Sequence, residues 1–186
     1  MKITTVFLDR DGVLNVDKPE YLLSLTDVQI HDDVPAAVKK LTDAGMRIIV
    51  VSNQAGIGKG LLDEMDAEMI FQTIIIGVEA DGGKIDAYYY CPHTKDDECT
   101  CRKPEIGMFM QAVKDHGVLL EESVLVGDGF CDAKAAETLN IPFYLVRRGW
   151  GPATKRKCDT AGTPYVSVKD LREAVEKILA LKDTTQ

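Results

Sequence analysis

Two carboxylates separated by a single residue follow a short apolar run near the start of the chain. Asp9 and Asp11 flank Arg10, and Gly12 comes next. The first carboxylate can attack a substrate or bind a metal ion, and the second can act as an acid or a base. Gly12 lets the backbone turn close to a ligand. A solvated turn rich in Asp and Gly has the same composition, so this motif needs support from elsewhere in the chain.

Two later segments carry groups suited to phosphate and to a metal ion. Ser52 and Asn53 offer a hydroxyl, an amide and backbone N–H groups, which can hold phosphate oxygens. Asp128 and Asp132 add two carboxylates, and Mg²⁺ is bound by few carboxylates together with water and substrate phosphate. Asp132 has a second interpretation, as the N-cap of a helix.

Cysteines and a histidine cluster in the middle of the chain. Cys91, His93, Cys99 and Cys101 supply three thiolates and one imidazole, enough to complete a tetrahedral structural zinc site. Buried unpaired thiols are a poor alternative, because the acidic residues 96–98 make the segment polar. We therefore predict a bound zinc ion.

A pair of cations follows the last of these zinc ligands. Arg102 and Lys103 precede Pro104, and they are suited to neutralising a phosphoryl group. Adjacent surface cations are more often only solvated, so the pair alone decides little. A zinc ion that rigidifies the loop 91–104 would fix both cations at the substrate.

Four short motifs, in this order, resemble those of the haloacid dehalogenase superfamily of aspartate-nucleophile phosphatases. The matching segments are Asp9-Arg-Asp11-Gly12-Val-Leu-Asn15, Ser52-Asn53, Lys103 and Gly127-Asp128-x-x-x-Asp132. Three further segments resemble the zinc-loop branch of that superfamily, which holds the heptose 1,7-bisphosphate 7-phosphatases and the histidinol-phosphate phosphatases. They are Tyr90-Cys91-Pro92-His93, Cys99-x-Cys101-Arg102-Lys103-Pro104 and Gly107-Met108.

The resemblance, which spans nearly the whole chain, implies a Mg²⁺-dependent phosphomonoesterase that works through an aspartyl phosphate. Asp9 would be the nucleophile, and Asp11 would act first as the acid and then as the base. Ser52 and Lys103 would hold the phosphoryl oxygens. Asp9, Asp128 and the backbone carbonyl of Asp11 would bind Mg²⁺.

Within the zinc branch the resemblance favours heptose 1,7-bisphosphate, with histidinol phosphate as the alternative. Asn53 and Arg102 would bind the substrate, and Asp132 would support the site. Ala55 and Gly129 depart from the heptose group, which commonly has serine and a larger polar residue at these positions. A non-catalytic zinc module that binds phosphorylated ligands is a further alternative, but both carboxylates of the first motif are present.

Alternating strands and amphipathic helices position these groups. Apolar runs predict strands over 3–9, 46–51, 85–90, 123–126 and 142–146, and helical spacing predicts helices over 34–44, 62–80, 106–116 and 132–139. Asp33 is the expected N-cap of the first helix, and a capping box at 167–170 predicts a last helix reaching residue 181. Residues 148–164, with three glycines and two prolines, predict a loop. The alternation favours an α/β Rossmann-like three-layer fold with a mostly parallel sheet, a minimal cap and function at the strand ends.

The size and composition of the chain fit one folded domain, residues 1–186. Apolar residues make up 45% and charged residues 28%, and 22 basic against 30 acidic residues give a net charge of −8, which disfavours a nucleic-acid partner. No apolar run approaches the about 20 residues of a membrane span, and the N-terminal run is too short for a signal peptide. We therefore expect a cytoplasmic protein with no membrane partner, favour a monomer, and expect Cys131 and Cys158 to be free thiols.

Overall fold

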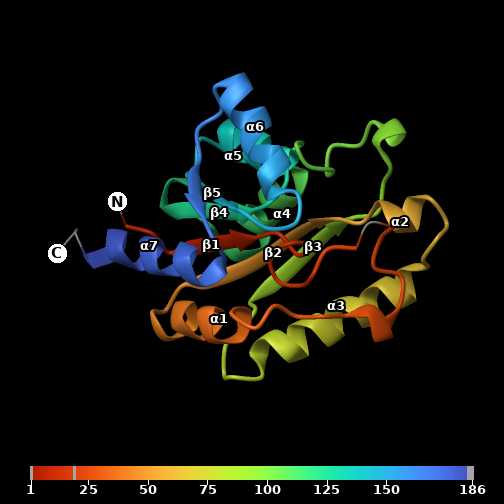
Figure 1. The fold of residues 1–186 in the computed structure, drawn as a ribbon, viewed down its shortest axis with the longest axis horizontal. Helices are drawn as coiled ribbons and strands as arrows, with labels where there is room; N and C mark the ends of the chain where they lie inside the picture. The colour runs from red at the N-terminus through yellow and green to blue at the C-terminus, as the bar shows by residue number, and fades with distance from the viewer. Residues whose placement is uncertain (1, 19, 184–186) are drawn as a thin grey trace.

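The computed structural model describes residues 2–18 and 20–183, which form a six-stranded parallel sheet between two layers of helices (Figure 1). The strand order is β3-β2-β1-β4-β5-β6. The strands are Thr5–Leu8 (β1), Arg47–Asn53 (β2), Ala87–Cys91 (β3), Ser123–Gly127 (β4), Phe143–Val146 (β5) and Val166–Val168 (β6). The predicted Rossmann-like α/β fold is confirmed.

Helices cover both faces of this sheet. In Figure 1, α1, α3 and α7 lie on one side and α4, α5 and α6 on the other. The helices are Val34–Asp43 (α1), Ala55–Gly58 (α2), Glu64–Glu79 (α3), Gly107–His116 (α4), Phe130–Leu139 (α5), Gly151–Ala161 (α6) and Leu171–Asp183 (α7). Among the described residues, we find no helix whose length and apolar content would let it cross a bilayer.

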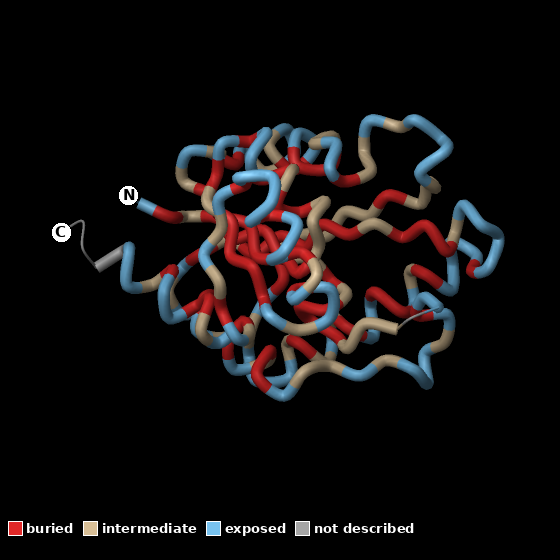
Figure 2. The backbone as a smooth tube through the Cα atoms, turned by 45° about the horizontal axis from the view of Figure 1, so that its top comes forward, coloured by how far each residue is buried: buried red, intermediate tan, exposed pale blue. Residues whose placement is uncertain are grey.

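The central strands β1, β2, β4 and β5 are buried on both faces, so their successive side chains enter two separate apolar cores. Val6 and Leu8 of β1 pack in the core under α1, α3 and α7, whereas Phe7 packs in the core under α4 and α5. Figure 2 shows this buried interior in red, with exposed segments at the periphery. Continuous apolar runs in the sequence are therefore the expected signature of these strands.

The order of the strands reverses next to β1. β1 pairs with β2 on one side and with β4 on the other. In open parallel sheets, ligands bind in the crevice at the carboxyl ends of the strands where the order reverses. Residues directly after β1 and β4 are therefore placed to form a site.

The predicted loop over 148–164 is wrong, because α6 occupies most of it. Pro152 lies in the first turn of α6, where its missing N–H costs nothing, and Gly162 ends the helix with φ +69°. The prolines and glycines that indicated a loop mark mainly the two ends of a helix.

The predicted capping box at 167–170 is also wrong. Ser167 lies in β6, a strand that the sequence did not indicate. The helix is instead capped by Asp170, whose Oδ1 accepts from Glu173 N, and Glu173 Oε2 accepts from Lys169 N, the residue before the cap. α7 therefore begins at Leu171.

Asp33 precedes α1 as predicted, but its carboxylate makes no hydrogen bond within that helix. Asp33 Oδ1 instead lies 2.7 Å from Arg148 Nη1, and Asp33 Oδ2 accepts from Leu171 N at 3.0 Å. The positive charge of Arg148 and the free N–H groups at the start of α7 are stronger partners. Asp33 thus joins α1, α7 and the chain after β5.

Candidate active site

Lys103 lies between two carboxylates, one that follows a strand and one on a helix. Its Nζ is 2.9 Å from Asp9 Oδ1, directly after β1, and 2.6 Å from Asp132 Oδ1, in the first turn of α5. It also donates to the carbonyl oxygen of Val51 at 2.8 Å. The Lys103 side chain is 1% exposed. Burial opposes its charged form, but Asp132 and Asp9 outweigh this effect and raise the pKa of Lys103, so the amine stays protonated.

Three carboxylates converge beside this lysine. Asp9, Asp128 and Asp132 each offer an oxygen, and these atoms lie within 4.8 Å of one another. Burial and the charge of Asp132 raise the pKa of Asp9 to about 7, against the opposing effect of Lys103. Burial and the charges of Asp9 and Asp132 raise the pKa of Asp128 to about 8. Three ionised carboxylates would carry more negative charge than one lysine compensates, and this repulsion favours their protonated forms.

The backbone holds Asp128 in a tight cradle. A Cβ atom at Gly12 would lie 2.1 Å from Asp128 Oδ2, and one at Gly149 would lie 2.2 Å from the same oxygen. Both glycines have positive φ. Trp150 N donates to this oxygen at 2.8 Å. Only glycine fits at these two positions.

A hard divalent cation such as Mg²⁺ fits the donor set of the cluster. Asp132 has a donor at each oxygen, Lys103 at Oδ1 and Gly129 N at Oδ2, whereas the partners above occupy one oxygen of Asp9 and one of Asp128, so these two carboxylates keep an oxygen for a metal. Asp132 is 0% exposed, takes part directly in the cluster, and also caps α5 from the third helical position by accepting from Gly129 N, the N-cap residue.

Asp11 is held apart from this cluster. Arg10 Nη2 donates to both oxygens of Asp11, at 2.9 and 2.8 Å. Asn15 Nδ2 and Gln54 Nε2 donate to one oxygen each. Burial opposes ionisation, but the charge of Arg10 and the hydrogen bonds, that of Asn15 first, outweigh it and lower the pKa of Asp11. Asp11 is an ionised acceptor in this arrangement, the form required of a base.

Arg10, Asn15 and Gln54 were not among the predicted site residues. The Arg10 side chain is 1% exposed, and its guanidinium lies 4.8 Å from the centre of the Phe71 ring. The sequence did place Arg10 between two aspartates, so a carboxylate partner for this arginine was a visible signal. Gln54 gave no such signal, since its partner Asp11 lies 43 positions away.

Ser52 and Asn53 lie within the last residues of β2 rather than after it. Ser52 Oγ accepts from Gln54 Nε2 at 2.8 Å. Asn53 Nδ2 donates to the Lys103 carbonyl at 3.0 Å, and Lys103 N donates to Asn53 Oδ1 at 2.9 Å. Asn53, predicted to bind substrate, therefore fixes the backbone of Lys103.

The four predicted zinc ligands converge. Cys101 Sγ lies 3.1 Å from Cys91 Sγ, 3.5 Å from Cys99 Sγ and 3.2 Å from His93 Nδ1. These separations are too long for a disulfide bond and a little shorter than the roughly 3.8 Å expected between thiolates on one tetrahedral zinc. Three thiols and an imidazole suit Zn²⁺ rather than Mg²⁺. Cys131 and Cys158 are free thiols outside the cluster, as predicted.

The loop 91–104 has little apolar burial of its own. Only Cys91 and Lys103 are buried within it. The Arg102 guanidinium donates to the carbonyl of His93 at 3.0 Å, so this cation is tied to a residue of the zinc cluster. Zinc would hold the loop and, through it, both neighbouring cations.

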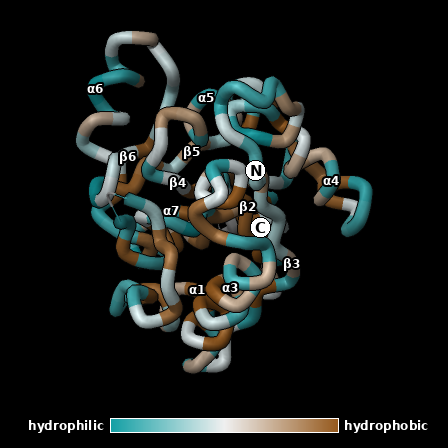
Figure 3. Tube along the Cα trace, turned by 90° about the vertical axis from the view of Figure 1, so that its right-hand side faces the viewer, coloured by the Kyte–Doolittle hydropathy of each residue, from teal (hydrophilic) through white to brown (hydrophobic). Residues whose placement is uncertain are grey.

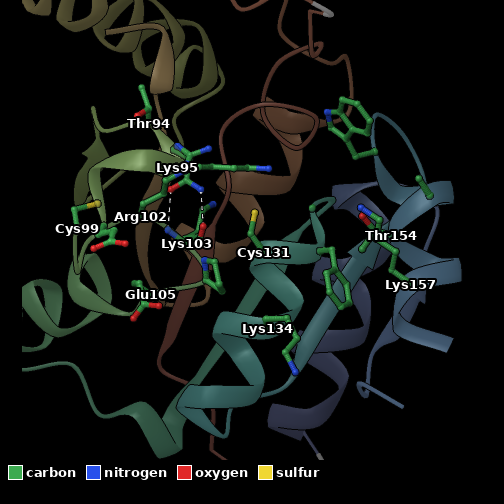
Figure 4. A pocket seen from close by; sticks show the side chains of 17 residues that line it. Thr94, Lys95, Cys99, Arg102, Lys103, Glu105, Cys131, Lys134, Thr154 and Lys157 are labelled. Carbon is green, nitrogen blue, oxygen red and sulfur yellow. Dashed lines mark hydrogen bonds between the residues drawn. The ribbon is translucent and has the colours of Figure 1, made fainter. Parts of the chain in front are cut away.

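A pocket of about 700 Å³ opens between this loop and the helices α5 and α6 (Figure 4). Arg102 and Lys95 lie on one side, Lys134 and Lys157 on the other, and Lys103 lies between them. Glu98 and Glu105 are the acidic residues in its wall. Much of α6 is hydrophilic in Figure 3. Positive charge thus gathers at this pocket in a chain with a net charge of −8.

Comparison with known proteins bears directly on this site. A probable D-glycero-D-manno-heptose-1,7-bisphosphate 7-phosphatase of Thermoplasma volcanium is 38% identical over 144 residues, which are 77% of this chain and 98% of the relative. The chain belongs to the haloacid dehalogenase-like phosphatases. The family model described as HAD-hydrolase-like matches residues 100–174, from Thr100 in the zinc loop into α7.

Further relatives of this haloacid dehalogenase-like phosphatase point to the same group. The D-glycero-beta-D-manno-heptose-1,7-bisphosphate 7-phosphatase of Haemophilus ducreyi is 39% identical over 152 residues, 77% of this chain and 83% of the relative. The crystal structure of D,D-heptose 1,7-bisphosphate phosphatase from B. bronchiseptica, complexed with magnesium and phosphate, superposes with a TM-score of 0.89. It is 30% identical, and the match covers 96% of this chain and 99% of that one. The family expected from the motifs is confirmed.

Proposed function

We propose that this phosphatase removes the 7-phosphate of D-glycero-D-manno-heptose 1,7-bisphosphate in a Mg²⁺-dependent reaction. The observation that carries the proposal is the position of Asp9. It follows β1 beside Asp128 and pairs with Lys103, which also lines the pocket where the other cations gather. The relatives at 38% and 39% identity, both named heptose-1,7-bisphosphate 7-phosphatases, support the substrate.

In the proposed mechanism, an Asp9 oxygen attacks the phosphorus atom and forms an aspartyl phosphate while the bond to the sugar oxygen breaks. Because the lowered pKa leaves Asp11 ionised in the free protein, its carboxylate takes up a proton from water when the anionic substrate binds, and it gives that proton to the sugar oxygen. Asp11 then takes a proton from a water molecule, which attacks the aspartyl phosphate, releases inorganic phosphate and restores Asp9. Lys103 Nζ orients the nucleophile, and Ser52 and Lys103 bind phosphoryl oxygens.

Mg²⁺, bound by Asp9, Asp128 and the backbone carbonyl of Asp11, would neutralise charge on the phosphoryl oxygens. The raised pKa values of Asp9 and Asp128 support a cation there, because a positive charge between these carboxylates favours their ionised forms. Zn²⁺ at the cysteine cluster would hold the loop that carries Arg102 and Lys103.

The cations of the pocket support a substrate with a second anionic group. Among the described residues, neither Lys95, Arg102 nor Lys157 has a carboxylate within 4.0 Å, whereas Lys134 pairs with Glu137. Unpaired cations facing one pocket favour a ligand with more than one negative charge. Histidinol phosphate, the alternative from the sequence, has a cationic end that this lining disfavours.

The test is phosphate release from the heptose bisphosphate, in both anomeric forms, beside histidinol phosphate and a simple aryl phosphate, with Mg²⁺ present. We expect kcat/KM for one heptose anomer to exceed that for histidinol phosphate by at least about 100-fold. Equal or reversed values would contradict the substrate. No Mg²⁺-dependent release from any ester would contradict phosphatase activity itself.

A further inference from the structure

Gln54 lies between two groups that act at different stages of the proposed reaction. Its Nε2 donates to Ser52 Oγ at 2.8 Å and to Asp11 Oδ2 at 3.0 Å. The residue is 6% exposed. Its backbone N donates to the carbonyl of Cys91 at 2.7 Å, which anchors it to the first residue of the zinc cluster.

These two hydrogen bonds have defined directions. The amide nitrogen of glutamine has two hydrogens and cannot accept, so one hydrogen goes to each partner. Because Ser52 Oγ accepts from Gln54, its own single hydrogen points elsewhere and is free for a phosphoryl oxygen. The same amide group fixes one oxygen of Asp11.

The other donors to Asp11 have no such link. Arg10 and Asn15 also bind the Asp11 carboxylate, but among the hydrogen bonds of the described residues neither reaches Ser52. Gln54 alone therefore joins the hydroxyl expected to bind phosphate to the carboxylate expected to move protons.

We propose that Gln54 is a positioning residue that couples phosphate binding at Ser52 to the orientation of Asp11. The proposal rests on the proposed phosphatase function. A substrate phosphoryl group that takes the Ser52 hydroxyl hydrogen fixes the serine, and the shared amide then fixes Asp11 relative to the same phosphoryl group.

Two substitutions of similar size separate this role from simple packing. Gln54→Met removes both N–H donors without adding charge, and Gln54→Glu replaces them by acceptors that repel Asp11 and turn the Ser52 hydroxyl hydrogen toward position 54. We expect Gln54→Met to lower kcat/KM for an alkyl phosphate about 10- to 100-fold and Gln54→Glu to lower it more. Loss of Asp11 orientation affects leaving groups that need a proton, so the loss on p-nitrophenyl phosphate should be several-fold smaller. A packing defect would lower both rates equally, and that result would overturn the proposal.

A double-mutant cycle tests the coupling itself. Adding Gln54→Met to Asp11→Asn should cost much less than Gln54→Met costs alone, since the carboxylate it orients is gone. Fully additive losses would refute the coupling. Gln111→Glu is the matched control for Gln54→Glu. Gln111 on α4 donates to both oxygens of Asp115 at an exposed position, and we expect its substitution to leave activity unchanged.

A binding measurement keeps the inference separate from the proposed substrate. With Mg²⁺ present, Gln54→Met should weaken the binding of inorganic phosphate about 10-fold, as measured by calorimetry, and Ser52→Ala should have a similar effect. Unchanged phosphate affinity in a folded Gln54→Met protein would overturn the inference, even if the heptose bisphosphate proves to be the substrate. Failure of the unmodified protein on that sugar alone would overturn only the proposed substrate.

Discussion

The carboxylate cluster and the zinc loop are neighbours that gain their order from different sources. Asp9 and Asp128 follow strands buried on both faces, and Asp132 lies in the first turn of a helix packed on that sheet. The loop 91–104 has just two buried residues, and its four ligand side chains converge on one point. Apolar burial places the first region, whereas a metal ion would have to place the second. Substitutions in the carboxylate cluster should therefore lower activity without unfolding, whereas substitutions in the zinc loop should lower activity by disordering the loop.

The largest effect is expected at the nucleophile. Asp9→Asn removes the attacking carboxylate but keeps its size, so activity should fall by at least about 10³-fold. The sheet does not depend on this carboxylate, and the thermal unfolding midpoint should stay close to that of the unmodified protein. Substantial Mg²⁺-dependent activity in a folded Asp9→Asn protein would exclude Asp9 as the nucleophile.

Asp11→Asn tests the second carboxylate of the buried region. General acid–base help contributes about 10²–10⁴-fold, so activity on an alkyl phosphate should fall by this amount. An aryl phosphate with an acidic leaving group needs less protonation and should lose less. Measuring kcat/KM of Asp11→Asn on both esters tests the acid role, and equal losses on the two would argue against it.

Cys99→Ala should break the zinc loop while leaving the sheet intact. Elemental analysis should show less than the about one zinc per chain expected of the unmodified protein, and proteolysis should begin within 91–104. Misplacement of Arg102 and Lys103 should lower activity about 10- to 100-fold. Cys158→Ala, at a buried thiol outside the cluster, is the control for zinc content. Full activity without zinc would refute the assignment.

Lys157→Gln sharpens the comparison at the wall of the pocket opposite the zinc loop. Loss of one unpaired cation should raise KM for a bisphosphate up to about 10-fold and change KM for a monophosphate little. Lys155→Gln is the matched control, because Lys155 lies on the same helix but is paired with Asp159. Equal changes in KM for the bisphosphate in the two variants would mean that Lys157 contributes only to the overall charge of the surface.

The smallest effect concerns pH and the metal-free protein. The pKa values of Asp9 and Asp128 are raised to about 7 and about 8, so the folded state binds more protons than the unfolded state above about pH 4. The free energy of unfolding contributed by these groups should therefore fall as the pH rises from about 4 to 8. Mg²⁺ should reverse this loss, most strongly near pH 8. Denaturant melts with and without Mg²⁺ measure both effects, and an unchanged slope with pH would contradict the raised pKa values.

Much of the fold and the site followed from local patterns in the sequence. Continuous apolar runs indicated five of the six strands, and polar residues where those runs stop indicated Asp9, Ser52 and Asp128. The sequence did not predict β6, because this strand is short and Val166 at its start is 41% exposed. The sequence did not predict α6, because proline and glycine occur at helix ends as well as in loops.

The residues that hold Asp11 could not be predicted in the same way. Gln54 contacts Asp11 only because β1 and β2 are neighbours in the sheet, and no local pattern encodes that pairing. Asp33 likewise found its partners 115 and 138 positions away, at Arg148 and Leu171. Sequence spacing shows which side chains reach the strand ends, but hydrogen-bond partners there depend on the order of the strands.

The glycine cradle around Asp128 has a consequence for how the molecule assembles. Gly12 follows β1 and Gly149 follows β5, on either side of the strand that carries Asp128, and Trp150 N completes the contact. The final orientation of this carboxylate therefore requires β1, near the start of the chain, together with the consecutive strands β4 and β5. A partly folded chain in which β5 has not yet docked holds Asp128 without its cradle, so tight Mg²⁺ binding should arise late in folding and report that the C-terminal half has reached its native register.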